Sequence, residues 1–125
     1  MKNIVSQNAP APIGPYSQAI ATGNLLFVSG QIALNPATGQ LVLENIQAET
    51  RLVMENLKAI LTAAGTGFNK VVKATIFLKD MNDFAEVNAI YGAYLTEPFP
   101  ARETVQVAAL PKNVNVEIAV IALLA

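Results

Sequence analysis

Two charged side chains stand in apolar stretches near the end of the chain, and their chemistry is complementary. Residues 113–125 read NVNVEIAVIALLA, in which Glu117 is the only charge. Arg102 opens a strand-like run that ends at Leu110. Buried charges are costly unless they pair with another charge or serve a function. We therefore expect a carboxylate and a guanidinium on neighbouring strands, forming a small polar site set into an apolar sheet.

Each member of this pair has a functional and a structural interpretation. The guanidinium of Arg102 is a permanently charged fork suited to binding a carboxylate or a phosphate. Partial desolvation is expected to raise the pKa of Glu117 towards the range useful for proton transfer. The structural alternatives are an ion pair of Arg102 with Glu117 or Glu103, and a pairing of Glu117 with an arginine at a subunit interface. Sequence alone leaves both interpretations open.

Four other residues are candidates for lining the same site. Asn88 follows Phe84 by four residues on the apolar stripe of a predicted helix, where an inward asparagine indicates a hydrogen-bonding role. Ser29 and Gly30 end a strand, and glycine lets a ligand approach the backbone. Tyr16 follows a Gly-Pro turn and offers a hydroxyl group. The plainer explanations are exposure for Asn88, a bulge for Ser29 and Gly30, and packing for Tyr16.

The residue types that are missing narrow the chemistry. The sequence has no histidine and no cysteine, which excludes Ser-His and Cys-His nucleophiles, thiol chemistry and histidine-ligated zinc. Any catalysis must use carboxylates, Arg, Lys, Tyr, hydroxyls, backbone groups and water. The formal net charge of -1 gives no electrostatic footprint for nucleic acid. We expect neither a metal nor a cofactor.

The balance of charged and apolar residues points to assembly. Charged residues make up 14% of the chain, against a usual figure of about 25%, and apolar residues make up 53%. This deficit indicates a face buried against other subunits, although a tightly packed monomer would also explain it. The chain has no long apolar span, and its first residues lack the apolar core of a signal peptide. We therefore expect a cytoplasmic protein without membrane contact.

Periodicity and turn residues predict a single domain, 1–125, with the element order β-β-β-α-β-α-β-β. One helix is expected at Ile46–Ala64, and a second between a cap at Asp80 or Asn82 and Pro98. The expected strands are Lys2–Ser6, Gln18–Ala21, Leu25–Gln31, Val71–Leu78, Ala101–Ala109 and Asn115–Leu123. We expect the last two strands to form a hairpin around residues 111–113. Two helices can cover only one face of such a sheet, and the last strand is apolar on both faces, so a partner subunit is expected to cover the other.

Several motifs in order resemble the Rid (reactive intermediate deaminase) family, also called YjgF-type or L-PSP endoribonuclease-like proteins. The likeness covers nearly the whole chain. Its anchors are Ala9-Pro10, Ile13-Gly14-Pro15-Tyr16-Ser17-Gln18, Val28-Ser29-Gly30-Gln31-Ile32, Asn56-Leu57-Lys58-Ala59-Ile60-Leu61, Val72-Lys73-Ala74-Thr75, Met81-Asn82-Asp83-Phe84, Val87-Asn88, Pro100-Ala101-Arg102, Leu110-Pro111-Lys112 and Val116-Glu117-Ile118.

This resemblance implies a fold and an activity. The fold is a chorismate-mutase-like α+β subunit, with a six-stranded mixed sheet and two helices packed on one face, assembled as a homotrimer with clefts between subunits. The activity is hydrolysis of 2-imino and 2-enamino acids, such as 2-aminoacrylate and 2-iminobutyrate. The arginine matching Arg102 binds the substrate carboxylate, and the glutamate matching Glu117 handles a water and its protons. The positions matching Tyr16, Ser29, Gly30 and Asn88 line the same cleft.

Two positions depart from the family pattern, and other functions remain open. Where the family commonly has Ser or Thr, this chain has Glu103, and where it often has Cys, this chain has Thr104. Strand alternation directs Glu103 away from the face of Arg102 and keeps the hydroxyl of Thr104 on that face, so we include Thr104 among the site residues. The alternatives to a deaminase are a non-catalytic binder of small carboxylates, a ribonuclease or translation inhibitor, and a chaperone-like structural role.

Overall fold

The long helix α1, Ile46–Ala63, forms where the apolar stripe predicts it, in a computed structural model that describes residues 1–124. Asn45 caps its first turn, because its side-chain oxygen accepts a hydrogen bond of 2.7 Å from the Ala48 N–H. The helix ends before Gly65, whose φ of 80° is favourable for a residue without a side chain. On the apolar stripe of α1, Val53, Leu57, Ile60 and Leu61 are completely buried.

The second helical segment begins with a short 3₁₀ turn, η2 (Met81–Asp83), and continues as helix α2 (Phe84–Ala93). Asp80 is the cap, since its carboxylate accepts a hydrogen bond of 2.9 Å from the Asn82 N–H. Four residues of the helical segment contact the core: Phe84, Val87, Tyr91 and Tyr94. Among residues 1–124, no helix combines the length and apolarity needed to cross a bilayer.

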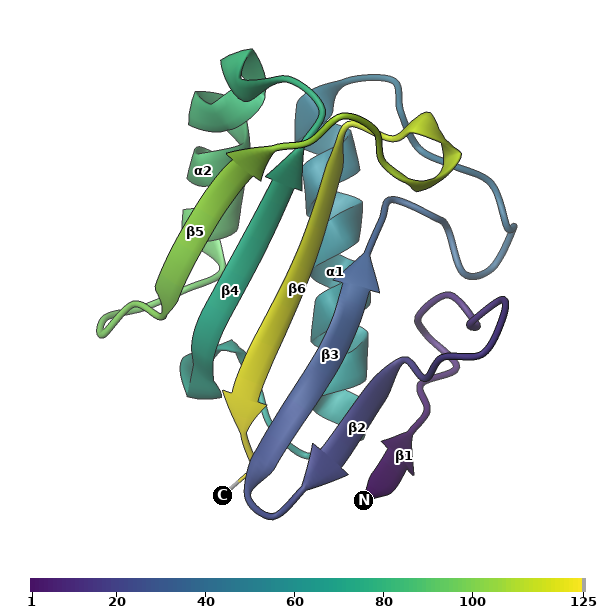
Figure 1. Ribbon diagram of the computed structural model, residues 1–125, viewed down its shortest axis with the longest axis vertical. Coiled ribbons are helices and arrows are strands. Elements are labelled where there is room, and N and C mark those ends of the chain that lie inside the picture. The colour runs from purple at the N-terminus through teal and green to yellow at the C-terminus, as the bar shows by residue number, and fades with distance from the viewer. Residues whose placement is uncertain (125) are drawn as a thin grey trace.

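Six strands form one mixed sheet with both helices on the same face (Figure 1). The strands are β1 (Lys2–Ile4), β2 (Ala19–Thr22), β3 (Leu25–Gln31), β4 (Val71–Leu78), β5 (Ala101–Gln106) and β6 (Val116–Leu123). Their spatial order is β1-β2-β3-β6-β4-β5. β4 and β5 run parallel and are joined through α2, whereas the other neighbours are antiparallel. The predicted α+β chain fold, a six-stranded mixed sheet with two helices on one face, is therefore confirmed.

The expected hairpin between the last two strands is wrong. β5 lies at the edge of the sheet beside β4, and β6 enters the middle, between β3 and β4, after a 3₁₀ turn (η3, Pro111–Asn113). The reason is burial. β6 is apolar on both faces and so belongs at the centre, while β5 carries Arg102, Glu103 and Gln106 and suits an exposed edge. β5 also ends three residues earlier than predicted.

The two faces of the sheet differ in burial. On the helix side, Ala74, Leu78 and Ile118 are completely buried. On the other side, residues of β4 and β6 are only half-buried, and the side chains of Phe27 and Val105 are 42% and 40% exposed. A single chain thus leaves large apolar side chains of this face exposed, in agreement with the low content of charged residues.

A buried carboxylate joins helix α1 to the start of β6. Glu49 is completely buried, and one of its oxygens accepts hydrogen bonds from the backbone N–H groups of Asn115 (2.7 Å) and Val116 (3.2 Å). Its other oxygen accepts a hydrogen bond of 2.7 Å from the Asn115 side chain. Charge-assisted hydrogen bonds of this kind compensate for the desolvation of a carboxylate. Glu49 therefore fixes the point at which the central strand begins.

Replacing Glu49 with alanine should lower the free energy of unfolding by about 3 kcal/mol or more, because three buried donors lose their acceptor. Denaturant unfolding of the parent and the variant measures the difference. The matched control is Glu44→Ala, which removes an exposed carboxylate and should change the free energy of unfolding by about 0.5 kcal/mol or less. Equal losses in the two variants would contradict a structural role for Glu49.

Candidate functional site

The carboxylate of Glu117 lies directly against the backbone of Gly30. Glu117 is half-buried on β6, and Gly30 lies near the end of β3. A methyl group placed on Gly30 would overlap the Glu117 carboxylate, so no larger residue fits there with the present side-chain position. The pairing of β3 with β6 shifts register between Val28 and Gln31, so the bulge considered at Ser29 and Gly30 is present. This bulge brings the β3 backbone against the carboxylate.

Burial shifts the acidity of this carboxyl. Desolvation raises the pKa of Glu117, and it is the sole cause of the shift. A carboxyl with a raised pKa exchanges protons more readily near neutral pH than an exposed one does. The position therefore has the property expected of a proton-transfer group.

A cavity of about 580 Å³ opens beside Gly30, and Tyr16 and Ser29 also line it. The Ser29 hydroxyl donates a hydrogen bond of 2.6 Å to the carbonyl of Ser17, so it ties β3 to the loop before β2. Tyr16 is 53% exposed, and its hydroxyl accepts a long hydrogen bond of 3.4 Å from the Ile13 N–H. Tyr16 therefore keeps an accessible hydroxyl at this cavity, whereas the Ser29 hydroxyl is already engaged.

Two buried amide side chains hold the loops around this cavity, and one of them, Gln18, also lines it. Gln18 accepts a hydrogen bond of 2.7 Å from the Ser6 N–H and donates one of 2.8 Å to the carbonyl of Pro10, which holds the loop that carries Tyr16. Asn56 on α1 donates to the carbonyl of Leu34 at 3.0 Å. Buried polar groups need partners, and here the partners are loop carbonyls that no strand satisfies. Neither Gln18 nor Asn56 was predicted to have such a role from the sequence pattern.

Arg102 lies elsewhere, at the edge strand β5, where it contacts helix α2. Its Nη1 donates a hydrogen bond of 2.5 Å to Oδ1 of Asn88. Its guanidinium carbon lies 5.6 Å from the ring centre of Phe84 and 5.4 Å from that of Tyr91, within the range of cation–π contacts. A second cavity, of about 380 Å³, is lined by Arg102, Asn88 and Tyr91 among others. Asn88 is thus half-buried and engaged with Arg102 instead of simply exposed.

The two residues after Arg102 point to opposite faces, as strand alternation predicts. Glu103 forms an ion pair with Lys73 at 3.1 Å, away from Arg102. Thr104 is paired with Ile76, which is buried under the helices, and its hydroxyl oxygen is buried without a hydrogen-bond partner among the described residues. The hydroxyl of Tyr91 is likewise buried and unpartnered there. Neither Tyr91 nor Phe84 was among the predicted site residues, although their spacing places them on one helical stripe with Asn88.

Within one chain the predicted site residues fall into two groups that do not meet. Arg102 pairs in register with Ala74 on the helix side of the sheet, whereas Glu117 pairs with Phe77 on the open side. Strand β4 lies between them. The expectation that the guanidinium and the carboxylate occupy neighbouring strands is therefore wrong. The first group contains Tyr16, Ser29, Gly30 and Glu117, and the second contains Asn88, Arg102 and Thr104.

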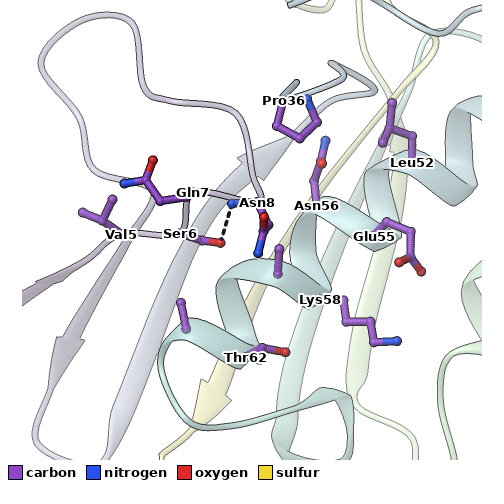
Figure 2. A pocket seen from close by; sticks show the side chains of 12 residues that line it. Val5, Ser6, Gln7, Asn8, Pro36, Leu52, Glu55, Asn56, Lys58 and Thr62 are labelled. Carbon is purple, nitrogen blue, oxygen red and sulfur yellow. Dashed lines mark hydrogen bonds between the residues drawn. The ribbon is translucent and has the colours of Figure 1, made fainter. Parts of the chain in front are cut away.

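A third cavity, of about 600 Å³, contains none of these residues (Figure 2). It lies between residues 5–8 and the outward side of α1, and the charged side chains of Glu55 and Lys58 extend away from residues 5–8. In the part of the chain that the structure describes, no three acidic side chains gather where they could hold a metal ion. The predicted site residues thus lie outside this third cavity.

Comparison with known proteins identifies the family. The family model described as Endoribonuclease L-PSP matches residues 6–124. The 2-iminobutanoate/2-iminopropanoate deaminase of Escherichia coli K12 is 51% identical over 97% of this chain and 96% of its own. The chain belongs to the Rid family (YjgF/L-PSP), which confirms the resemblance carried by the motifs.

Solved Rid-family structures share the whole fold. RidA from an Antarctic Psychrobacter has a TM-score of 0.94 at 46% identity and covers 98% of this chain, which in turn covers 99% of RidA. Escherichia coli TdcF with bound serine has a TM-score of 0.93 at 43% identity, with 98% of each chain covered. The six-stranded mixed sheet and the two helices are thus common to this chain and to these Rid-family proteins.

Replacing Gly30 with alanine in this Rid-family chain should displace the Glu117 carboxylate and lower the free energy of unfolding by about 1–3 kcal/mol, because the new methyl group overlaps it. Denaturant unfolding and a crystal structure of the variant measure both effects. The control is Gly92→Ala in helix α2, where nothing lies within 4 Å of the added atom. That control should raise the free energy of unfolding by about 0.5–1 kcal/mol. A Gly30→Ala protein as stable as its parent, with Glu117 unmoved, would show that the close approach is unimportant.

The raised pKa of Glu117 predicts a pH-dependent effect on stability. A carboxyl whose pKa rises on folding binds protons more tightly in the folded state, so its ionisation opposes folding. This penalty is absent below the unfolded pKa, grows as pH rises towards the folded pKa, and is complete above it. Glu117→Gln removes the penalty, so the stability of this variant relative to the parent should increase between about pH 4 and about pH 7.

Unfolding curves at both pH values measure this effect. Glu44→Gln, at an exposed position, is the control and should show no comparable increase. An unchanged difference between parent and Glu117→Gln would rule out a folded-state carboxyl that resists ionisation.

Proposed function

We propose that this protein is a 2-iminobutanoate/2-iminopropanoate deaminase, a hydrolase that converts reactive imines and enamines such as 2-aminoacrylate into 2-oxo acids and ammonia in the cytoplasm. The observation that carries the proposal is the desolvated Glu117 carboxyl packed against Gly30, which lines a cavity, in a chain that also presents the exposed side chain of Arg102. The name of the Escherichia coli relative and the serine bound to TdcF support a small amino- or imino-acid ligand.

The reaction needs only the groups that the two clusters supply. The enamine gains a proton at its terminal carbon and becomes the imine. Arg102 binds the substrate carboxylate through two N–H groups, while Glu117 removes a proton from water as the water oxygen bonds to the imine carbon. Transfer of protons to the nitrogen and cleavage of the carbon–nitrogen bond then release ammonia and the 2-oxo acid. Imines already hydrolyse in water, so positioning and one acid–base group suffice.

The proposed active unit is a homotrimer with its clefts between subunits. Two observations support an assembly: Arg102 and Glu117 are separated by β4 within one chain, and the sheet face opposite the helices leaves Phe27 and Val105 exposed. In this arrangement the Arg102 cluster of one subunit faces Glu117 and the cavity beside Gly30 of the next. Tyr16, Ser29, Gly30, Asn88 and Thr104 would then line or support the shared cleft.

Arg102→Ala and Glu117→Gln should each lower turnover about 100-fold or more, measured as pyruvate release when a serine dehydratase supplies 2-aminoacrylate. Mixing the two variants and exchanging their subunits should restore about a quarter of the parent activity, because that share of shared clefts receives both intact residues. The parent should sediment with a mass near three times 13.2 kDa.

Arg51→Ala, at an exposed arginine on α1, is the control and should keep parent turnover. A mixture as inactive as its components would contradict a site shared between chains. If the parent does not accelerate pyruvate release from 2-aminoacrylate, and if it binds 2-oxobutanoate as well as Glu117→Gln does, the protein is a carboxylate-binding protein and not a deaminase.

A further inference from the structure

The Arg102 guanidinium is held by three side chains from one face of helix α2. Phe84, Asn88 and Tyr91 follow the spacing i, i+4, i+7, which places them on one stripe of the helix. The two rings lie 5.6 Å and 5.4 Å from the guanidinium carbon, and Asn88 accepts from Nη1. All three contacts thus converge on one flat cationic group.

This arrangement is unusual for an exposed arginine on an edge strand. An arginine side chain has many rotamers, and its free movement opposes any fixed geometry for binding a ligand. Among the described residues, the one ion pair joins Lys73 to Glu103. Arg102 therefore has no carboxylate partner among these residues. The contacts from α2 therefore hold the side chain without neutralising its charge.

The hydrogen-bonding pattern leaves the guanidinium available to an anion. Asn88 accepts a hydrogen bond from Nη1 of Arg102. The two aromatic rings contact the flat face of the guanidinium and therefore use none of the N–H donors in its plane. Several N–H donors remain for a bidentate carboxylate. The Arg102 cavity lies at the same place, with Tyr91 in its lining.

We propose that Phe84 and Tyr91, with Asn88, are positioning residues that hold the Arg102 guanidinium ready to bind the substrate carboxylate. The inference rests on the proposed function for its substrate, but the restraint of Arg102 is a property of the free protein. The ring of Tyr91 performs this role and its hydroxyl does not, since the hydroxyl is buried without a partner.

The kinetic test compares Tyr91→Leu and Phe84→Leu with the conservative Tyr91→Phe. Loss of either ring should raise KM about five- to tenfold and change kcat by about twofold or less, because carboxylate binding is weakened before the chemical step. Tyr91→Phe keeps the ring and should keep the parent KM. Phe68→Leu is the matched control, since Phe68 packs on Tyr94 at 5.4 Å and makes no contact of this kind with Arg102. It should lower Tm without raising KM.

A second test needs no substrate. The chain has two arginines, Arg51 and Arg102, so their Nε–Hε groups give two signals in a nitrogen-15 relaxation experiment. In the parent, Arg102 should be rigid and the exposed Arg51 mobile. Tyr91→Leu should make Arg102 as mobile as Arg51, whereas Tyr91→Phe should leave it rigid.

The outcomes separate this inference from the proposed function. A mobile Arg102 in the parent, or a rigid one in Tyr91→Leu, overturns the inference whether or not the protein is an enzyme. A KM for Tyr91→Phe as high as that for Tyr91→Leu overturns the role of the ring. A rigid Arg102 that Tyr91→Leu releases, in a parent without turnover, supports the inference and removes the proposed deaminase activity.

Discussion

The structure depends on the placement of β6 in the centre of the sheet. This strand is apolar on both faces, and at its start Glu49 accepts three hydrogen bonds from Asn115 and Val116. Because the side chains of a strand alternate, fixing where β6 begins also decides which residues face the helices. A shift of one residue would turn Glu117 under the helices, where its charge has no partner. The helix-to-strand contact thus determines that the carboxylate lies on the open face, beside Gly30.

The polar side chains of β5 place this strand at the edge of the sheet. A strand carrying Arg102, Glu103 and Gln106 cannot replace β6 in the interior, so it pairs with β4 at the edge. Its parallel direction requires a crossover, and that crossover is helix α2. Helix α2 therefore both connects β4 to β5 and supplies the side chains that contact Arg102. Residues of α2 thus contribute both to the packing of the sheet and to the surroundings of Arg102.

The local sequence pattern predicted most of the helices and strands, but it did not predict which strands lie side by side in the sheet. The bounds of β3 and β4 were predicted without error, and α1 to within one residue, because periodicity and turn residues are local signals. The predicted hairpin between β5 and β6 was wrong because it paired two strands that follow each other in the sequence. The apolar residues on both faces of β6 instead favour a place in the centre of the sheet. The candidate site residues came from composition and from motifs. The contacts of Glu49 and Tyr91 were missed, since each depends on a partner more than ten residues away.

The separation of Arg102 from Glu117 within a chain has a chemical consequence. A permanent guanidinium–carboxylate pair lowers the pKa of the carboxyl and keeps it ionised. Here burial alone acts on Glu117, and its pKa rises. In the proposed shared cleft, Arg102 would bind the substrate carboxylate. The charge of its guanidinium would then be balanced by the substrate and would not lower the pKa of Glu117. The Glu117 carboxylate would then be free to take a proton from water and return it to the departing ammonia, in a chain that has no histidine or cysteine for this role.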